Sequence, residues 1–121
     1  ILESEAVIVD RNAKFDQQPD IPEITKAKYR FVERLRGVVF ARQYVMLDYD
    51  CPKHLLEQAV QVTPGLESPT ISPLANDSSV AVRAMVPRKG HNAVMDRLAE
   101  IGAHAILASN IRSCRAMRAA E

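Results

Sequence analysis

The chain contains 121 residues, of which 47% are hydrophobic and 26% charged, and its formal net charge is +1. This composition is typical of a soluble globular domain with a short appendage. The basic residues are scattered along the sequence, which argues against a nucleic-acid or membrane-surface binder, and no apolar run approaches the roughly 20 residues of a membrane span.

Two features bear on the origin and compartment of the chain. It begins with Ile1 and not with Met, and residues 1–10 lack the basic start and long apolar stretch of a signal peptide. We therefore expect a piece of a longer protein. The two cysteines, Cys51 and Cys114, are far apart and show no zinc-site spacing, so we expect free thiols and a cytoplasmic location.

The N-terminal third is predicted to contain a strand, a linker and a long helix. Residues 4–10 alternate in the manner of a short strand, whose pairing partners would lie in the missing N-terminal part. Residues 11–20 are polar and rich in turn formers, as in a linker. Apolar residues at helical spacing then predict a helix from Pro22 to about Arg42, and Gly37 in its interior indicates a close helix contact.

The rest of the sequence predicts four strands and two helices in the order β-α-β-β-α-β. The strands are expected at residues 44–50, 69–75, 80–86 and 103–109. Pro73 favours an edge position for the second strand, and a hairpin turn is expected at 76–78. One helix is expected from Pro52 to just before Pro64, and another between the turn at 87–90 and Gly102. This order is that of an α+β, ferredoxin-like domain, with two helices on one face of an antiparallel sheet.

The second face of this sheet is expected to carry more apolar surface than one helix layer covers. The residues assigned to it are Tyr44, Met46, Ala84 and Ile106. We therefore expect the open face to meet another subunit. An RNA-binding sheet is an alternative, but it requires exposed aromatic and basic residues on the central strands. Only Tyr44, Tyr49 and Arg83 are available there, with two acidic residues beside them, so nucleic acid is not an expected partner.

No motif in the sequence indicates catalysis or metal binding. The chain has no phosphate loop of the GxxxxGK[ST] type, no nucleophile elbow and no acidic loop for a phosphoribosyl diphosphate. Asp48 and Asp50 would share one strand face, as an acid–base pair would, but a carboxylate near a helix start more often accepts backbone hydrogen bonds. No histidine lies beside a second ligand, so no metal site is expected. Met46 and Met85 are interpreted as core fillers, and Arg83 as a solvated charge.

Asp50 is a candidate ligand-binding residue because of its place at a strand-to-helix corner. Pro52 favours the first helical position, which would make Cys51 the N-cap. Asp50 would then remain available for a cation such as an amino group or an imidazolium. A local hydrogen bond is the alternative for this carboxylate.

The loop at 63–71 is the second candidate. Its glycine and prolines restrict the path of the chain, while Ser68 and Thr70 offer hydroxyl groups toward a carboxylate. Leu66 could contact an apolar ligand group. Such a loop can hold a small zwitterion, and an ordinary turn is the alternative.

Five runs of the sequence occur in order and resemble one known family. They are SEAVIV, RGVVFARQYVMLDYDCP, TPGLESPTISPLA, VAVRAMVPR and VMDRLAEIGAHAILASNIR. From Ser4 to about Arg115, the chain resembles the C-terminal third of long-form ATP phosphoribosyltransferases, the first enzymes of histidine biosynthesis. The LDYDCP and PGLESPTISPLA stretches resemble the actinobacterial branch.

The resemblance implies a domain division and a regulatory function. Residues 1–43 would comprise the end of a catalytic domain, a linker and a connecting helix. Residues 44–115 would form the ferredoxin-like histidine-binding domain, and 116–121 a disordered tail. The full enzyme joins ATP to phosphoribosyl diphosphate with Mg²⁺, in domains that precede this region. The fragment itself would then have no catalytic residue and no cofactor, would help to assemble hexamers, and would bind L-histidine as a feedback inhibitor.

The resemblance also implies a set of inhibitor-binding residues. The positions that match the contacts of the family are Asp50, Leu66, Thr70, Met85 and Ala105. Met85 stands where close relatives often carry Leu, a change that conserves volume. Gly90 and His91 replace a more typical acidic residue at a helix start, where Gly is an acceptable N-cap. An assembly module that binds no ligand is the alternative function.

Overall fold

The computed structural model describes residues 3–10 and 21–115 and divides into two compact units, Ile1–Val32 and Glu33–Glu121. The predicted linker at 11–20 and the predicted disordered tail at 116–121 lie outside the described residues. Residues 4–10 were predicted as a strand, and this prediction is wrong for the described structure, in which they form neither helix nor strand. A strand requires a hydrogen-bonded neighbouring strand, and the one sheet among the described residues does not include this segment.

Helix α1 covers Pro22–Arg42, as predicted. The carbonyl of Ile21 accepts hydrogen bonds from the amides of Ile24 and Thr25, so Pro22 occupies the first turn, where its missing N–H is of no consequence. Gly37 is buried in the second half of the helix. Its close neighbour is the chain segment after the last strand, and not a second helix, because the Cys114 N–H donates to the Gly37 carbonyl at 2.9 Å.

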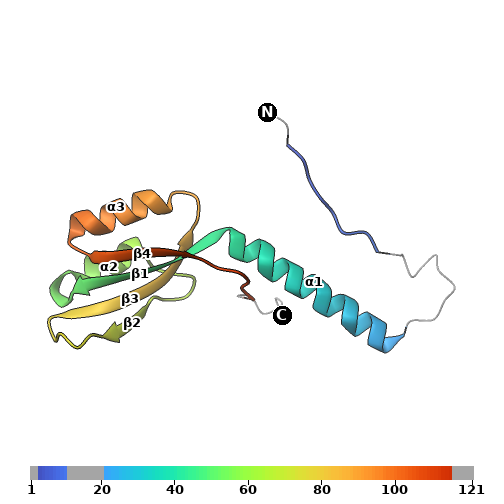
Figure 1. The fold of residues 1–121 in the computed structure, drawn as a ribbon, viewed down its shortest axis with the longest axis horizontal. Coiled ribbons are helices and arrows are strands. Elements are labelled where there is room, and N and C mark those ends of the chain that lie inside the picture. The colour runs from blue at the N-terminus through green and yellow to red at the C-terminus, as the bar shows by residue number, and fades with distance from the viewer. Residues whose placement is uncertain (1–2, 11–20, 116–121) are drawn as a thin grey trace. The chain divides into compact units, whose positions relative to one another are not determined.

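The second unit contains the α+β domain that the sequence predicts. Its elements in order are β1 Tyr44–Pro52, the 3₁₀ turn η1 Lys53–Leu55, α2 Leu56–Val62, β2 Thr70–Pro73, β3 Ser79–Pro87, α3 His91–Ile101 and β4 His104–Asn110. The four strands form one antiparallel sheet in the order β2-β3-β1-β4 (Figure 1). This is the ferredoxin-like order, and β2 is an edge strand, as Pro73 predicts.

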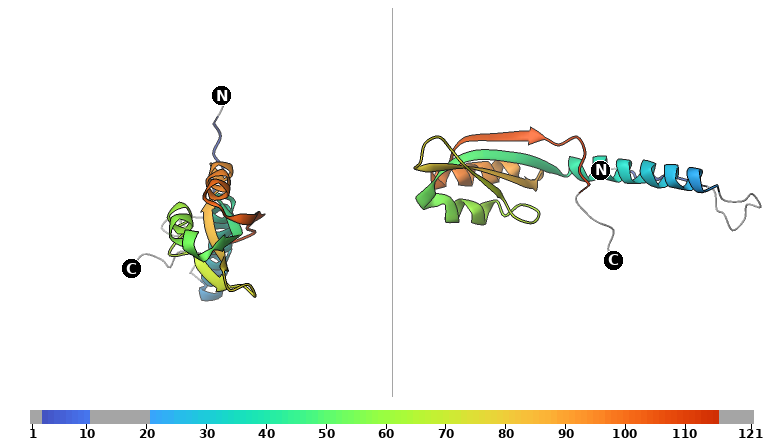
Figure 2. Two further views of the ribbon diagram at one scale, coloured as in Figure 1. Left: turned by 90° about the vertical axis from the view of Figure 1, so that its left-hand side faces the viewer. Right: turned by 90° about the horizontal axis from the view of Figure 1, so that it is seen from below.

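Helices α2 and α3 lie on the same face of the sheet (Figure 2). The core beneath them includes Leu47, Tyr49, Val82 and Leu98, each no more than 1% exposed. Ala84 and Ile106 were predicted on the opposite face, and this prediction is wrong. Ala84 shares the buried side of β3 with Val82, and Ile106 packs against the core cluster. The bulge in β4 described below shifts the alternation of that strand, which the sequence pattern does not reveal.

The corner after β1 also differs from its prediction. Pro52 ends the strand instead of beginning a helix, and Cys51 is buried in the core instead of acting as an N-cap. The strand continues this far because Pro52 still pairs with Ser79, and the next amide, of Lys53, donates to the Ser78 carbonyl. The 3₁₀ turn then leads into α2. Asp50 consequently lies within the strand and not at a helix start.

The predicted turns agree with the structure. In the β2–β3 hairpin, the Asn76 side-chain oxygen accepts hydrogen bonds from the Ser78 amide and hydroxyl at 3.0 and 2.7 Å. Helix α3 ends at Gly102, whose φ of +119° lies in the left-handed region that favours glycine. A Cβ there would also come within 2.8 Å of the end of the Leu55 side chain, which would have to shift, so the positive φ is the constraint that favours glycine.

Candidate ligand-binding site

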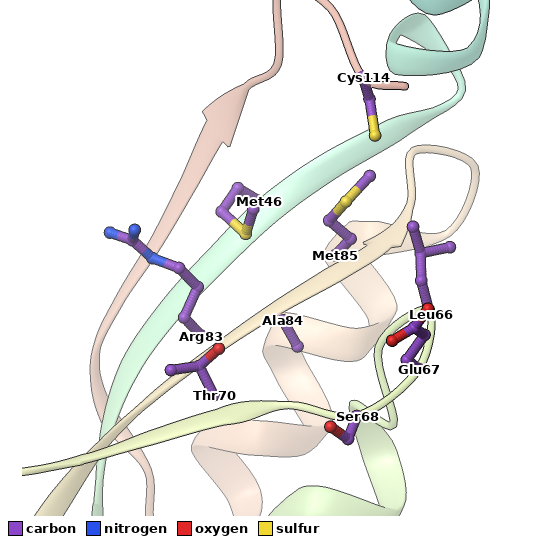
Figure 3. Close-up of a pocket in the computed structure, with 9 residues that line it drawn as sticks. All are labelled: Met46, Leu66, Glu67, Ser68, Thr70, Arg83, Ala84, Met85 and Cys114. Atoms are coloured by element: carbon purple, nitrogen blue, oxygen red, sulfur yellow. The ribbon is translucent and has the colours of Figure 1, made fainter. Parts of the chain in front are cut away.

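A cavity of about 330 Å³ lies where β3 extends past the end of β2. Thr70, the first residue of β2, pairs with Arg83, so the next residues of β3 have no strand partner on that side. The loop before β2 lies beside them instead. The residues that line the cavity are Met46, Leu66, Glu67, Ser68, Thr70, Arg83, Ala84, Met85 and Cys114 (Figure 3). Its volume suits a small metabolite.

Three of the five predicted ligand-binding residues line this cavity. They are Leu66, Thr70 and Met85. Leu66 is 44% exposed, so its side chain is accessible from the cavity. Its position depends on Gly65, whose φ is +73° and where a Cβ would lie 3.2 Å from the Ser68 carbonyl oxygen. Glycine therefore permits the tight turn that brings Leu66 to the cavity.

Met46 and Cys114 are cavity residues that sequence reasoning missed. Met46 is the direct cross-strand partner of Met85, so the two side chains stand on the same face of the sheet. The alternation of β1 and β3 shows which residues share a face, but it shows that Met46 and Met85 are neighbours only once the register of the two strands is known. Cys114 follows the last strand and reaches the cavity through the tertiary fold. Met85, interpreted from the sequence as a core filler, is half-buried on the open face.

The open face carries an ion pair between neighbouring strands. The Arg83 Nε donates to the Asp48 carboxylate at 2.7 Å, and the two residues are register partners. Arg83 is therefore paired and not simply solvated, as the sequence had suggested. This contact neutralises one of the two carboxylates on this face of β1.

Asp50 is the second carboxylate and is not engaged in this way. It lies two residues beyond Asp48 on the same face of β1, opposite Ala81 on one side and His104 on the other. Its side chain is half-buried, none of its oxygens is both fully buried and unpaired, and the described residues provide it with no hydrogen bond or ion pair. The local hydrogen bond that was its alternative interpretation is thus not found. A cationic group would find an unneutralised acceptor here.

Ala105 forms a β-bulge beside Asp50. Asp48 pairs with Leu107 but Asp50 pairs with His104, so two residues of β4 face Tyr49. Ala105 has a φ of +52°, the only positive value at a non-glycine among the described residues. For alanine this conformation costs about 1–2 kcal/mol. Strained residues of this kind are concentrated at functional sites, and this favours a role for Ala105 in ligand binding.

The five predicted residues thus form two groups. Leu66, Thr70 and Met85 line the cavity, whereas Asp50 and Ala105 lie at the bulge between β1 and β4. Asp50 and Thr70 are separated by one intervening strand, roughly 10 Å across the sheet, and by two further residues along it. One copy of the chain therefore does not gather all five residues in one cavity.

The perturbed titratable groups of the described residues lie on the other side of the sheet. Burial raises the pKa of Tyr49, opposed by its hydrogen bond with Thr63, and burial also raises the pKa of Cys51. Both belong to the core and not to the cavity. Residues 3–10 and 21–115 contain no group of three His, Cys, Asp or Glu side chains suited to a metal ion. Within the same ranges, no helix has the length and apolar character required to cross a bilayer.

Comparison with known proteins gives a consistent result. Residues 41–113 match the family described as HisG, C-terminal domain. ATP phosphoribosyltransferase of Rhodococcus jostii (strain RHA1) is 58% identical over 117 residues, which cover 97% of this chain and 39% of that protein. The homologue from Nocardia farcinica (strain IFM 10152) is 60% identical over 117 residues, covering 96% of this chain and 38% of the homologue. The chain spans about two fifths of the length of the curated relatives it matches.

Proposed function

The chain belongs to the HisG C-terminal domain family of the ATP phosphoribosyltransferases of histidine biosynthesis, and from this premise we propose that it is a regulatory domain that binds L-histidine. The ligand would contact Asp50, Leu66, Thr70, Met85 and Ala105. The parent enzyme would be cytoplasmic. Its Mg²⁺-dependent transfer would take place in the domains that correspond to the unmatched part of the relatives. The fragment itself would bind and regulate without catalysis.

The observation that carries this proposal is the unequal state of the two open-face carboxylates. Asp48 is neutralised by Arg83, whereas Asp50, two residues away, has no partner among the described residues. A half-buried carboxylate without a cation is stabilised when an ammonium group binds to it. An α-amino acid supplies such a group. The ammonium group of histidine is therefore assigned to Asp50.

Because one copy does not gather Asp50 with the cavity, the cavity of a second copy would hold the remaining groups of histidine. Leu66 and Met85 offer apolar surface to an imidazole ring, and the Thr70 hydroxyl is exposed and free to donate to a carboxylate. At the bulge, the methyl group of Ala105 leaves space that a larger side chain would occupy. These are the chemical requirements of a small zwitterion with one flat, partly apolar end.

Self-association is part of the proposal. The open face presents Met46 and Met85, with Leu107 62% exposed on the adjacent strand. A second copy on this face would cover that surface and could supply one group of site residues to the other. We propose that the parent assembles as a hexamer with the help of this domain. Histidine would then bind one arrangement of the subunits better than another and shift the population toward an inactive state.

The test is thermal unfolding of the chain with and without L-histidine, with histamine and other amino acids as ligand controls. At 100 times its dissociation constant, a ligand adds about 2.7 kcal/mol to the stability of the native state. We expect a histidine-specific rise that Asp50→Asn abolishes. Asp48→Asn is the matched control, because it makes the same change at the carboxylate that Arg83 already neutralises on the same strand face, and it should keep most of the rise. A chain that unfolds cooperatively at the same temperature with and without histidine would contradict the proposal.

The alternative function is assembly without ligand binding, and the exposed apolar residues of the open face favour it as the second candidate. Sedimentation equilibrium separates the two functions. An assembly module would associate equally with and without histidine, and Asp50→Asn would leave both the mass and the melting temperature unchanged. In either case we expect no diphosphate release from ATP and phosphoribosyl diphosphate by these 121 residues, which span about two fifths of the length of the relatives.

A further inference from the structure

The segment after β4, residues 111–115, is held at both of its ends, and we call it the C-terminal strap. Just before it, the Asn110 side-chain oxygen accepts a hydrogen bond from the Arg88 guanidinium at 3.0 Å. At its far end, the Cys114 N–H donates to the Gly37 carbonyl of α1 at 2.9 Å. The strap therefore connects the end of the sheet to the second half of the helix.

Gly37 fits this contact because it has no side chain. It is buried within a helix, where glycine is a poor choice compared with alanine. Its φ is not in the left-handed region, so backbone geometry does not require glycine here. A Cβ at this position would lie 3.2 Å from the Cys114 carbonyl oxygen and 3.5 Å from the Arg115 side chain. Close approach of the strap is thus the physical reason for glycine.

The strap also forms one wall of the cavity. Cys114 lines it together with Met46 and Met85, and Figure 3 shows the Cys114 sulfur directed toward these two methionines. Leu66 and Thr70 belong to the same cavity. One short segment therefore contacts α1 through its backbone and the cavity through its side chain.

We propose that Gly37 is a positioning residue for the ligand site: it lets the strap seat on α1 and close the cavity, and a ligand in the cavity in turn holds the strap against α1. This inference rests on the proposed function for the identity of the ligand, L-histidine. Because linkage is reciprocal, a change that separates the strap from the helix must lower the affinity for the ligand. Ligand binding must in turn favour the state in which the strap contacts the helix.

The first arm of the test needs no ligand and compares Gly37→Ala with Val39→Ala. Both variants place alanine in α1 and raise its helix propensity, but Val39 is 54% exposed and lies away from the strap contact. The readout is the alkylation rate of Cys114 by iodoacetamide, followed by mass spectrometry. Cys51, which is fully buried in the core, reports global unfolding in the same sample. We expect several-fold faster alkylation of Cys114 in Gly37→Ala alone, with Cys51 still protected.

The second arm repeats the measurement during a titration with L-histidine. Histidine should slow alkylation of Cys114 in the unmodified chain, and its dissociation constant should rise about tenfold in Gly37→Ala but not in Val39→Ala. Asn110→Ala provides a second variant, since it releases the other end of the strap without touching α1. It should also speed the alkylation of Cys114.

Several outcomes would overturn the inference. One is a Cys114 rate in Gly37→Ala and Asn110→Ala equal to that of Val39→Ala; another is an unchanged histidine affinity despite a faster rate. A glycine with a purely structural role would give a Gly37→Ala chain that is less stable, with the affinity for histidine intact. If the unmodified chain shows no response to histidine, the proposed function fails, while the ligand-free arm still decides whether Gly37 seats the strap.

Discussion

The two faces of the four-stranded sheet are built from the same strands but differ in how far their side chains are buried. The face beneath α2 and α3 is closed: Leu47, Tyr49 and Cys51 alternate into it and are almost completely buried. The opposite face consists of the residues between them, including Met46, Asp48 and Asp50, and these are only half-buried. Since period-two alternation sends successive residues of β1 to opposite faces, one strand supports both a core and a binding surface.

The comparison teaches where stability and function reside in this domain. Substitutions on the helix-covered face should act mainly on the free energy of unfolding. Substitutions on the open face should act mainly on ligand binding and association. The predictions below test this separation with neighbouring residues, from the largest expected effect to the smallest.

Leu47→Ala should produce the largest loss. Leu47 is 0% exposed, and its truncation leaves a cavity in the core, which typically destabilises a domain by about 2–5 kcal/mol. Met46→Ala is the matched change on the other face and should reduce the free energy of unfolding by less than about 1 kcal/mol. Urea denaturation of both variants measures the difference. Equal losses would show that the open face is as important for folding as the core.

Tyr49→Phe should remove a buried hydrogen bond without changing the shape of the core. The Tyr49 hydroxyl lies 2.7 Å from the Thr63 hydroxyl, which also donates to the Ala59 carbonyl. We expect a loss of about 1 kcal/mol, the usual net value for such a bond. Tyr44→Phe on the open face is the control and should change the free energy of unfolding little. A Tyr49 variant as stable as its parent would show that the hydroxyl pair does not stabilise the fold.

The free energy of unfolding should fall at alkaline pH because two titratable groups are buried on the helix-covered face of the sheet. Burial raises the pKa of Cys51 above its ordinary 9.0 and that of Tyr49 above its ordinary 10.0. In the unfolded chain these groups lose their protons first as the pH rises, so the stabilisation is fully present below pH 9 and is lost progressively above it. The free energy of unfolding as a function of pH tests this. Tyr49→Phe and Cys51→Ala should each flatten the decline, and a curve unaffected by either variant would assign it to other groups.

Arg83→Ala should have the smallest effect on folding. The Arg83–Asp48 pair is short, but the Arg83 side chain is 61% exposed, and such pairs contribute at most about 1 kcal/mol. Unfolding measured at low and high salt should show a small difference that salt reduces further. Arg83→Lys should restore part of it. A loss as large as that of Leu47→Ala would break the division between the two faces.

Much of the fold followed from local signals. Pro22, Pro73 and Gly102 marked a helix start, an edge strand and a helix end, and each does so because its backbone restricts the chain regardless of the surroundings. Residues 4–10 show the limit of such signals: alternation alone does not make a strand where no other strand of the described residues lies beside it. The corner at Cys51 and Pro52 shows another limit, because strand pairing with Ser79 outweighed the preference of proline for a helix start.

The sequence by itself determined the ferredoxin-like order, the alternation that separates the two faces, and the candidate residues Asp50, Leu66 and Thr70. Through its resemblance to a family it added Met85 and Ala105 as candidates. Only the tertiary structure decided the pairing of Asp48 with Arg83, the bulge at Ala105, and the meeting of Met46, Met85 and Cys114 around one cavity. The physical reason is that local backbone preferences are set by each residue and its neighbours. Strand register and the path of the C-terminal strap depend instead on contacts between segments far apart in the chain, which exist only when the core has formed.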